Sequence, residues 1–291
     1  MSSQKNIFQN YLSLVKFSHT VFALPFACIG FFIAVKLNHF PFSIKIFALV
    51  LLCMIFARSA AMAFNRYIDK DIDSKNDRTK NREIPAGIIS AKSALLFTIL
   101  NAGCFIAATY FINPLCFFLS PIALLVILGY SYTKRFTFLC HLVLGIGLSL
   151  APIGAYIAVT GKFALLPLLY SFAVLCWVSG FDMIYAMQDE DFDKSEKLFS
   201  VPASFGKKFS LRFSNLLHFL CFAFIAYAGY SAHFGYWYWI GTGIFTALLI
   251  YQHTLVKPND LSRVNIAFMT TNGIASVVFA IFVIVDLYFR A

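Results

Sequence analysis

The sequence predicts an all-α fold, a polytopic membrane protein in which nine transmembrane helices form one bundle. Of its 291 residues, 60% are hydrophobic and only 12% are charged. Apolar stretches of about 18 residues or more, the length that spans a bilayer as a helix, recur along the chain. Because lipid offers no hydrogen-bond partner, such stretches must form helices that satisfy their own backbone groups. The predicted spans are 17–36, 44–64, 93–112, 115–132, 140–160, 164–185, 212–231, 235–255 and 267–289.

Basic residues are concentrated on one side of this predicted topology. With nine spans, the N-terminus and the loops after the second, fourth, sixth and eighth spans share a side, which carries most of the 23 lysines and arginines. Such an excess marks the cytoplasmic side of a membrane protein. The net charge of +10 therefore reflects membrane orientation, and we expect no nucleic-acid partner. The predicted location is a bacterial inner membrane, with the polar loops in the cytoplasm.

Acidic residues are concentrated in two short windows. Eleven of the 13 carboxylates lie within 69–83 and 182–196. Asp69 and Asp73 are four residues apart, and a second pair with the same spacing follows 120 positions later. This second pair consists of Asp189 and Asp193. The matched spacing predicts one site that is built from two halves.

The chain also shows a weak internal duplication. Ile84-Pro85-Ala86 follows the first acidic window and Val201-Pro202-Ala203 follows the second. We predict a four-helix unit at about 10–135, its copy at 136–258, and a final helix at 267–289, all within a single transmembrane domain of residues 1–291. Units with an even number of spans run parallel and place both windows at the same membrane face. Chance resemblance of apolar segments is the alternative, and the acid pairs weigh against it.

The spacing of the acids predicts a magnesium site. Residues four apart share a helix face, so Asn65, Asp69 and Asp73 form one polar stripe. Tyr185, Asp189 and Asp193 form the other stripe, with Asp182 one turn further into the membrane. Carboxylates that face each other near lipid repel and need cations between them. Oxygen ligands favour Mg²⁺, which also binds phosphate oxygens. The alternative is that these acids are solvated helix ends balanced by lysines.

Basic residues next to the acids are suited to an anionic substrate. The run Arg78-Thr79-Lys80-Asn81-Arg82 follows the first window, and the fourth span ends in Tyr132-Thr133-Lys134-Arg135. Arginine binds phosphate in a bidentate manner and lysine binds it as a point charge. Metal ions and these side chains together would clamp a diphosphate, although loop charge on the cytoplasmic side explains the same residues without a substrate.

One arginine lies within a predicted span. Arg58 precedes Asn65 by seven residues, two helical turns deeper on the same face. A charged side chain inside a membrane is costly and is usually functional. We expect Arg58 to pair with an acid or to bind the carboxylate of an aromatic substrate. The 35 phenylalanines and 14 tyrosines could line a cavity for an isoprenoid tail and stabilise an allylic cation.

At this point the chain resembles the UbiA-type intramembrane aromatic prenyltransferases. The motif Asn65-x3-Asp69-x3-Asp73 resembles the first Asp-rich motif of that family. The second is matched by Asp182-x2-Tyr185-x3-Asp189-x3-Asp193. The run Arg78–Gly87 resembles the loop after the first motif, and Lys16–Pro25 resembles the opening of the 4-hydroxybenzoate polyprenyltransferase branch. Two positions depart from the family pattern. Glu83 stands where some members have proline, and Arg66 stands where many members have aspartate.

The resemblance implies a nine-helix bundle with Mg²⁺-bound diphosphate at its cytoplasmic mouth and a lateral opening to lipid. It implies that a polyprenyl diphosphate ionises and that the allylic cation attacks a small phenolic acid ortho to its hydroxyl. The predicted catalytic residues are Asp69, Asp73, Asp189, Asp193 and Arg135. The predicted metal ligands are Asn65, Asp69, Asp73, Asp189 and Asp193. The predicted substrate-binding residues are Asn65, Arg58, Arg78, Lys80, Arg82, Tyr132, Lys134, Asp182 and Tyr185.

Two alternatives to a 4-hydroxybenzoate polyprenyltransferase of quinone biosynthesis stay open. The first is an enzyme of the same kind that prenylates another acceptor, such as 1,4-dihydroxy-6-naphthoate in menaquinone biosynthesis. The second is a cation-coupled membrane transporter. Transporters place ionisable residues near the middle of the bilayer on broken helices, whereas the acids here lie at helix ends. The sequence therefore favours the enzyme.

Overall fold

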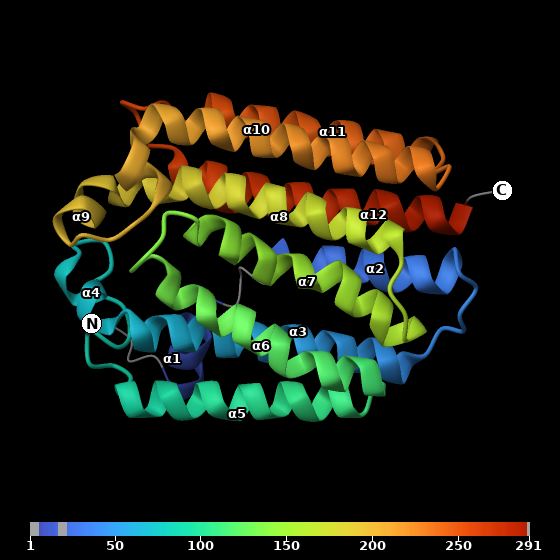
Figure 1. The fold of residues 1–291 in the computed structure, drawn as a ribbon, viewed down its shortest axis with the longest axis horizontal. Coiled ribbons are helices and arrows are strands. Elements are labelled where there is room, and N and C mark those ends of the chain that lie inside the picture. The colour runs from blue at the N-terminus through green and yellow to red at the C-terminus, as the bar shows by residue number, and fades with distance from the viewer. Residues whose placement is uncertain (1–5, 17–21, 290–291) are drawn as a thin grey trace.

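The computed structural model describes residues 6–16 and 22–289, and long helices dominate this part of the chain (Figure 1). The elements are α1 Ile7–Leu14, α2 Leu24–Lys36, α3 Ile44–Ile68, α4 Lys70–Lys75, α5 Ala91–Tyr110, α6 Pro114–Thr133, α7 Cys140–Thr160, α8 Leu165–Ala186, η2 Met187–Asp189, α9 Glu190–Ser195, α10 Val201–Ser231, α11 Tyr236–Thr254, η3 Ile266–Thr271 and α12 Asn272–Phe289. The predicted all-α membrane fold is confirmed.

Each predicted span coincides with a helix over its described residues, although the count of nine membrane crossings stays a prediction. Seven helices of the described chain are long and apolar enough to cross a bilayer. They are α3, α5, α6, α7, α8, α10 and α12. The helix α2 is apolar but shorter, with 13 residues, and α11 falls outside those seven. Residues 17–21, which begin the first predicted span and belong to the Lys16–Pro25 motif, lie outside the described residues.

Helix ends follow local sequence signals. Side chains of Ser43, Ser90 and Ser200 accept hydrogen bonds from the backbone N–H groups of the first turns of α3, α5 and α10. These side-chain oxygens satisfy N–H groups that a helix N-terminus leaves free. Gly206 has φ +79° and interrupts α10, because glycine adopts this left-handed region without a steric cost. The signals explain why α10 starts eleven residues before the predicted span at 212.

The helix α7 lies at the centre of the bundle. It packs against α2, α6 and α8, while α3 packs against α5 and α8 packs against α10. The largest cluster of buried apolar side chains joins α8, α10, α11 and α12 to α2 and α7. It contains Trp177, Phe245 and Phe279, with Tyr170 and Tyr238. The core therefore lies on one side of α7.

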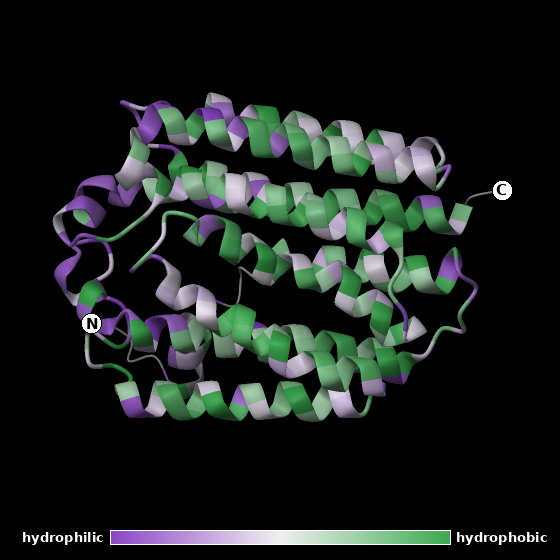
Figure 2. Ribbon diagram, viewed as in Figure 1, coloured by the Kyte–Doolittle hydropathy of each residue, from purple (hydrophilic) through white to green (hydrophobic). Residues whose placement is uncertain are grey.

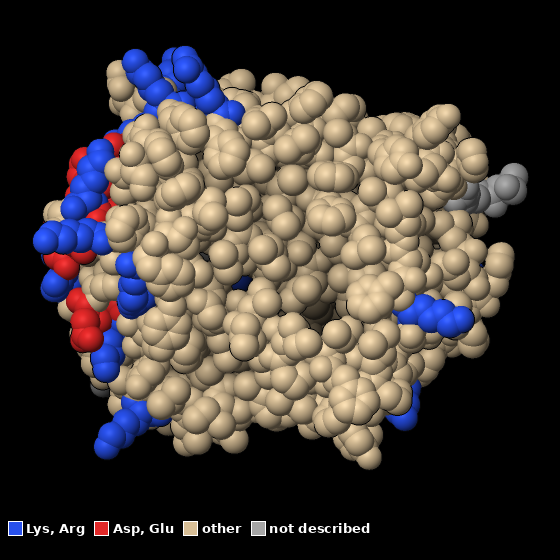
Figure 3. Space-filling view, viewed as in Figure 1, with Lys and Arg blue, Asp and Glu red and all other residues tan. Residues whose placement is uncertain are grey.

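Polar residues gather at one end of the bundle. Figure 2 shows hydrophilic residues around α4 and α9, at the end opposite the C-terminus, while hydrophobic residues run along the helices. Figure 3 shows acidic side chains at that end only, in the face that it presents, and a hollow in the uncharged flank. The short helix α1 packs there, with Leu14 fully buried. Long apolar helices with one charged end are typical of an integral membrane protein.

Candidate active site

The two acidic windows have the same backbone design. The helix α3 ends at Ile68 and α4 begins at Lys70, so Asp69 lies at the junction with φ −89° and ψ 3°. Asp189 lies at the junction of η2 and α9 with φ −100° and ψ 5°. Backbone hydrogen bonds from Asp69 to Asn65 and from Asp73 to Asp69 continue the helical path across the first junction. The predicted polar stripe is therefore preserved although each helix is interrupted.

Both stripes face one polar cavity of about 230 Å³. This polar cavity is lined by ten residues that the sequence analysis selected. They are Asn65, Asp69, Asp73, Arg78, Arg82, Lys134, Asp182, Tyr185, Asp189 and Asp193. The tertiary structure thus brings together residues that are 120 positions apart in the chain.

Asp69 is held by the end of α6. Lys134 Nζ donates to one carboxylate oxygen over 2.6 Å, and Arg135 Nη2 donates to the other over 2.9 Å. The Asp69 side chain is 3% exposed, and Asn65 Nδ2 adds a hydrogen bond of 3.1 Å. Two cations therefore neutralise this buried carboxylate, as burial of a charge requires.

The loop after α4 connects the two windows. Arg82 Nη1 donates to both oxygens of Asp73, over 2.8 and 2.9 Å. Arg78 donates through Nε and Nη2 to both oxygens of Asp189, and its Nη1 donates to the Tyr185 hydroxyl over 3.1 Å. Burial alone would lower the pKa of Arg78, but the hydrogen bonds and charge of Asp189 raise that pKa above its usual value. Arg78 is therefore a charged bridge from the first loop to the second window.

The other two acids in the cavity have uncharged or histidine partners. Ser200 Oγ donates to Asp193 over 2.8 Å. His141 Nδ1 lies 2.7 Å from Asp182 Oδ2. Sequence analysis missed His141 and Ser200, because each lies in a different segment from its partner and neither has a motif of its own. Asn76 was also missed, and its Nδ2 donates to Asp189. Its position three residues after Asp73 was a signal that could have identified it.

Four predicted residues are not part of the lining of the polar cavity. Arg135 is one of them, although it reaches the cavity by donating to Asp69. Lys80 forms an exposed ion pair with Asp77. Tyr132 is 44% exposed, although its ring lies 5.7 Å from the Arg135 guanidinium carbon. Arg58 lines a different cavity. The substrate-binding roles of Lys80, Tyr132 and Arg58 stay predictions.

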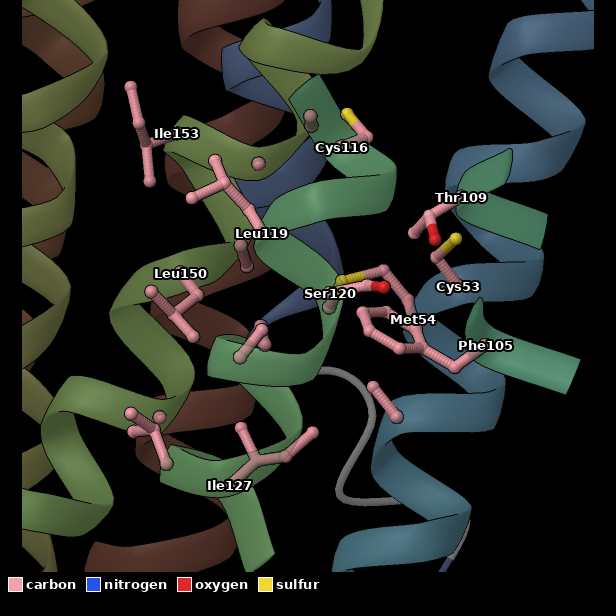
Figure 4. A pocket seen from close by; sticks show the side chains of 18 of the residues that line it. Cys53, Met54, Phe105, Thr109, Cys116, Leu119, Ser120, Ile127, Leu150 and Ile153 are labelled. Atoms are coloured by element: carbon pink, nitrogen blue, oxygen red, sulfur yellow. The ribbon is translucent and has the colours of Figure 1, made fainter. Parts of the chain in front are cut away.

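The second cavity is an apolar chamber of about 320 Å³ between α3, α5, α6 and α7. Figure 4 shows Cys53, Met54, Phe105 and Ser120 pointing toward one another in this apolar chamber. Arg58 contributes its charged group, and its Nε is buried without a hydrogen-bond partner. Among the described residues Arg58 has no ion-pair partner. A buried guanidinium without a carboxylate is costly, so an anionic ligand would stabilise it.

The two cavities share a wall. Tyr130 of α6 and Leu144 of α7 line both the polar cavity and the apolar chamber. A molecule with a charged head and an apolar body could therefore occupy both spaces. This arrangement is typical of a site for an amphipathic substrate.

The charges of the polar cavity fit divalent metal ions. Five aspartates line it, against the basic residues Arg78, Arg82 and Lys134. Even with Arg135 included, aspartates outnumber lysines and arginines by five to four, so a diphosphate would need added cations to bind there. In the described part of the chain, no three His, Cys, Asp or Glu side chains come close enough to hold a metal ion. Mg²⁺ suits such a site, because it takes one or two carboxylates and fills its remaining positions with water and phosphate.

Comparisons with known proteins identify the family of the chain. The UbiA prenyltransferase family model matches residues 23–274. A 4-hydroxybenzoate octaprenyltransferase from Nitrosomonas eutropha is 32% identical over 240 residues, which cover 82% of each chain. The apo structure of a UbiA homologue from Aeropyrum pernix is 32% identical, with a TM-score of 0.83, and covers 92% of this chain and 98% of that one.

A UbiA homologue from Archaeoglobus fulgidus, solved bound to GPP and Mg²⁺, shares the fold. Its TM-score is 0.73 at 21% identity, and the match covers 96% of this chain and 99% of that one. The family model covers most of the present chain, and the relatives match it over nearly their whole length. The chain belongs to the UbiA prenyltransferase family and is a membrane prenyltransferase.

Proposed function

We propose that this protein transfers a polyprenyl group from polyprenyl diphosphate to the ring of 4-hydroxybenzoate, ortho to the hydroxyl, in a Mg²⁺-dependent reaction of quinone biosynthesis. The observation that carries the proposal is the shared wall between an acid-rich polar cavity and an apolar chamber. A diphosphate would occupy the first, and the apolar chain and the aromatic acceptor would lie in the second. The name of the Nitrosomonas eutropha relative supports this acceptor.

The acids would hold Mg²⁺ through Asn65, Asp69 and Asp73 on one side and through Asp189 and Asp193 on the other. The metal ions, when bound, neutralise the diphosphate and stabilise it as a leaving group. The donor set supports this, because these side chains offer carboxylate and amide oxygens, the ligands that Mg²⁺ prefers. Lys134, Arg135, Arg82 and Arg78 now satisfy the oxygens of Asp69, Asp73 and Asp189, and Ser200 donates to Asp193.

Substrate binding would therefore exchange partners. With their acid partners holding metal ions, Arg78 and Arg82 would be free to donate to phosphate oxygens, together with Lys134 and Arg135. Arginine keeps its bidentate geometry in this exchange, because carboxylate and phosphate present similar pairs of oxygens. These donors stabilise the charge that develops as the allylic C–O bond breaks. The ion pairs of the ligand-free site also keep the acids from repelling one another.

Arg58 would bind the carboxylate of the acceptor. It is the one basic residue that lines the apolar chamber within the described chain, and its Nε has no partner there. An acceptor anchored at Arg58 would lie inside the membrane, with the polar cavity at its cytoplasmic end. The cytoplasmic orientation rests on the excess of basic residues at the end that carries the acids.

The test is a reconstituted reaction. Purified protein with Mg²⁺, a polyprenyl diphosphate and 4-hydroxybenzoate should release pyrophosphate and form the prenylated acid. Chelation should stop turnover and added Mg²⁺ should restore it. Turnover that persists after chelation would exclude the mechanism. Turnover measured with a panel of aromatic acceptors identifies the substrate. Faster turnover of 1,4-dihydroxy-6-naphthoate than of 4-hydroxybenzoate would assign the protein to menaquinone biosynthesis instead.

A further inference from the structure

His141 and Asp182 form a pair that the proposed function leaves without a role. Asp182 lies on α8 seven residues before Asp189, which places it roughly 10 Å deeper along the helix. The Asp182 side chain is 24% exposed and that of His141 is 4% exposed. Both line the polar cavity. This pair therefore lies at the inner end of the polar cavity, away from the acids that would hold Mg²⁺.

Hydrogen bonds indicate how the proton of the imidazole is placed. The backbone N–H of Val201 points at His141 Nε2 over 3.4 Å, so Nε2 accepts and presents a lone pair. In a neutral imidazole the other nitrogen then carries the proton. His141 Nδ1 accordingly donates to Asp182 Oδ2 over 2.7 Å. The donation orients the carboxylate, and the described residues form no other hydrogen bond to Asp182.

Asp182 differs from Asp69, Asp73 and Asp189 in its charge environment, and it differs from Asp193 in lying deeper and in having a histidine partner. Asp69, Asp73 and Asp189 each pair with arginine or lysine. Asp182 pairs with no lysine or arginine in the described part of the chain. A carboxylate whose oxygens are not bound by a guanidinium or ammonium group keeps a lone pair available to accept a proton.

The pair also lies next to the wall that separates the two cavities. Leu144 lines both the polar cavity and the apolar chamber, and it follows His141 by three residues, so the two share one face of α7. In the proposed reaction the diphosphate occupies one cavity and the acceptor the other. The carbon atoms that react must meet at this wall, within reach of the deepest acid.

We propose that Asp182, oriented by His141, receives the proton that the aromatic ring loses. The inference rests on the proposed prenyl transfer. The allylic C–O bond breaks and the diphosphate leaves with its electron pair, while a C–C bond forms at the ring carbon beside the hydroxyl. The proton on that carbon passes to Asp182, and the electrons of its C–H bond restore the aromatic ring. His141 is a positioning residue in this step.

A deuterium experiment tests the assignment. The acceptor is 4-hydroxybenzoate, unlabelled or deuterated at both positions ortho to the hydroxyl, and kcat is measured with each. Asp182→Asn should lower kcat by about 100-fold or more, the typical contribution of a general base. Because proton loss then limits the reaction, the deuterium isotope effect on kcat should exceed that of the natural enzyme. An isotope effect equal to that of the natural enzyme, or an unchanged kcat, would overturn the proposal.

Further variants separate a chemical role from a folding defect. His141→Leu removes the donor and should raise the isotope effect, whereas His141→Asn keeps an N–H group and should restore part of kcat. Asp191→Asn changes an exposed acid of the same window and should behave as the natural enzyme. A raised isotope effect in Asp191→Asn, or equal rates in the two His141 variants, would also overturn the assignment. Absence of product from the natural enzyme would instead reject the proposed prenyl transfer.

Discussion

The two sides of the bundle differ in packing far more than in sequence. In α6, on the side of the apolar chamber, 17% of the membrane-spanning window is buried, whereas in α8 the share is 67%. Yet α6 has the higher mean hydropathy over that window, 2.0 against 1.6 for α8. Lipid is as apolar as a protein core, so hydropathy does not separate the two environments. Of these two apolar helices, α8 packs in the core and α6 borders the apolar chamber.

The chamber side stays open because small side chains and glycines line it. Gly154 lines the chamber, and a Cβ added there would meet nothing within 4 Å. On the packed side, a Cβ on Gly180 would lie 2.4 Å from His218 Nε2. Trp177 fills the same region and donates to Asn272 over 2.8 Å. The packed side is therefore the support on which the second acidic window is held.

The largest effect should come from removing an acid of either window. Asp69→Ala and Asp189→Ala should each lower turnover by about 100-fold or more, and the double variant should be little worse, because both serve one site. The matched controls Asp71→Ala and Asp191→Ala change exposed acids and should retain activity. Pyrophosphate release measures all four. Loss of activity in only one of the two windows would refute a shared site.

Removal of a large ring should distinguish the two sides by stability. Trp177→Ala should destabilise the protein by about 3 kcal/mol or more, because it opens a cavity and leaves the buried Asn272 without its donor. Phe105→Ala widens the chamber, which is already open, and should cost much less. Thermal unfolding in detergent compares them. Equal losses of stability would mean that the chamber side is packed as tightly as the core.

A side chain added to glycine should separate function from stability. Gly154→Leu should reduce turnover with long polyprenyl diphosphates while the thermal midpoint stays close to that of the natural protein. Gly180→Leu should lower the midpoint instead, since its new atoms overlap His218. Turnover with a short and a long donor, measured beside thermal unfolding, tests both variants. If the prenyl chain does not bind in the apolar chamber, Gly154→Leu should turn over the long donor as fast as the natural protein does.

The smallest effect concerns how the first acidic loop is braced. Ser13 Oγ of α1 donates to Glu83 Oε1 over 2.5 Å, next to Arg82 in sequence. Ser13→Ala removes this hydrogen bond and should destabilise the ordered conformation of the loop by about 1 kcal/mol. Because the loop carries Arg78 and Arg82, KM for the diphosphate should rise roughly fivefold. Ser200→Ala, which removes the partner of Asp193 inside the cavity, should lower kcat as well. Identical effects of the two variants would show that α1 contacts the substrate site directly.

The sequence by itself determined the all-α membrane fold and most of the polar cavity. Apolar runs of helical length leave the backbone no alternative in lipid, and acids four residues apart must share a helix face. Asn65, Asp69, Asp73, Asp189 and Asp193 were therefore predictable as one set. The resemblance then linked that set to prenyl transfer, and the family membership agrees with it.

Tertiary structure alone decided which side of each apolar helix is buried, where the chamber lies and which partners the acids take. His141 reaches Asp182 from another helix, and Lys80 turns to Asp77 instead of the polar cavity. No local pattern encodes these outcomes, because they depend on contacts between segments far apart in the chain. Helices form from short-range hydrogen bonds, whereas a cavity exists only where several helices fail to fill the space between them.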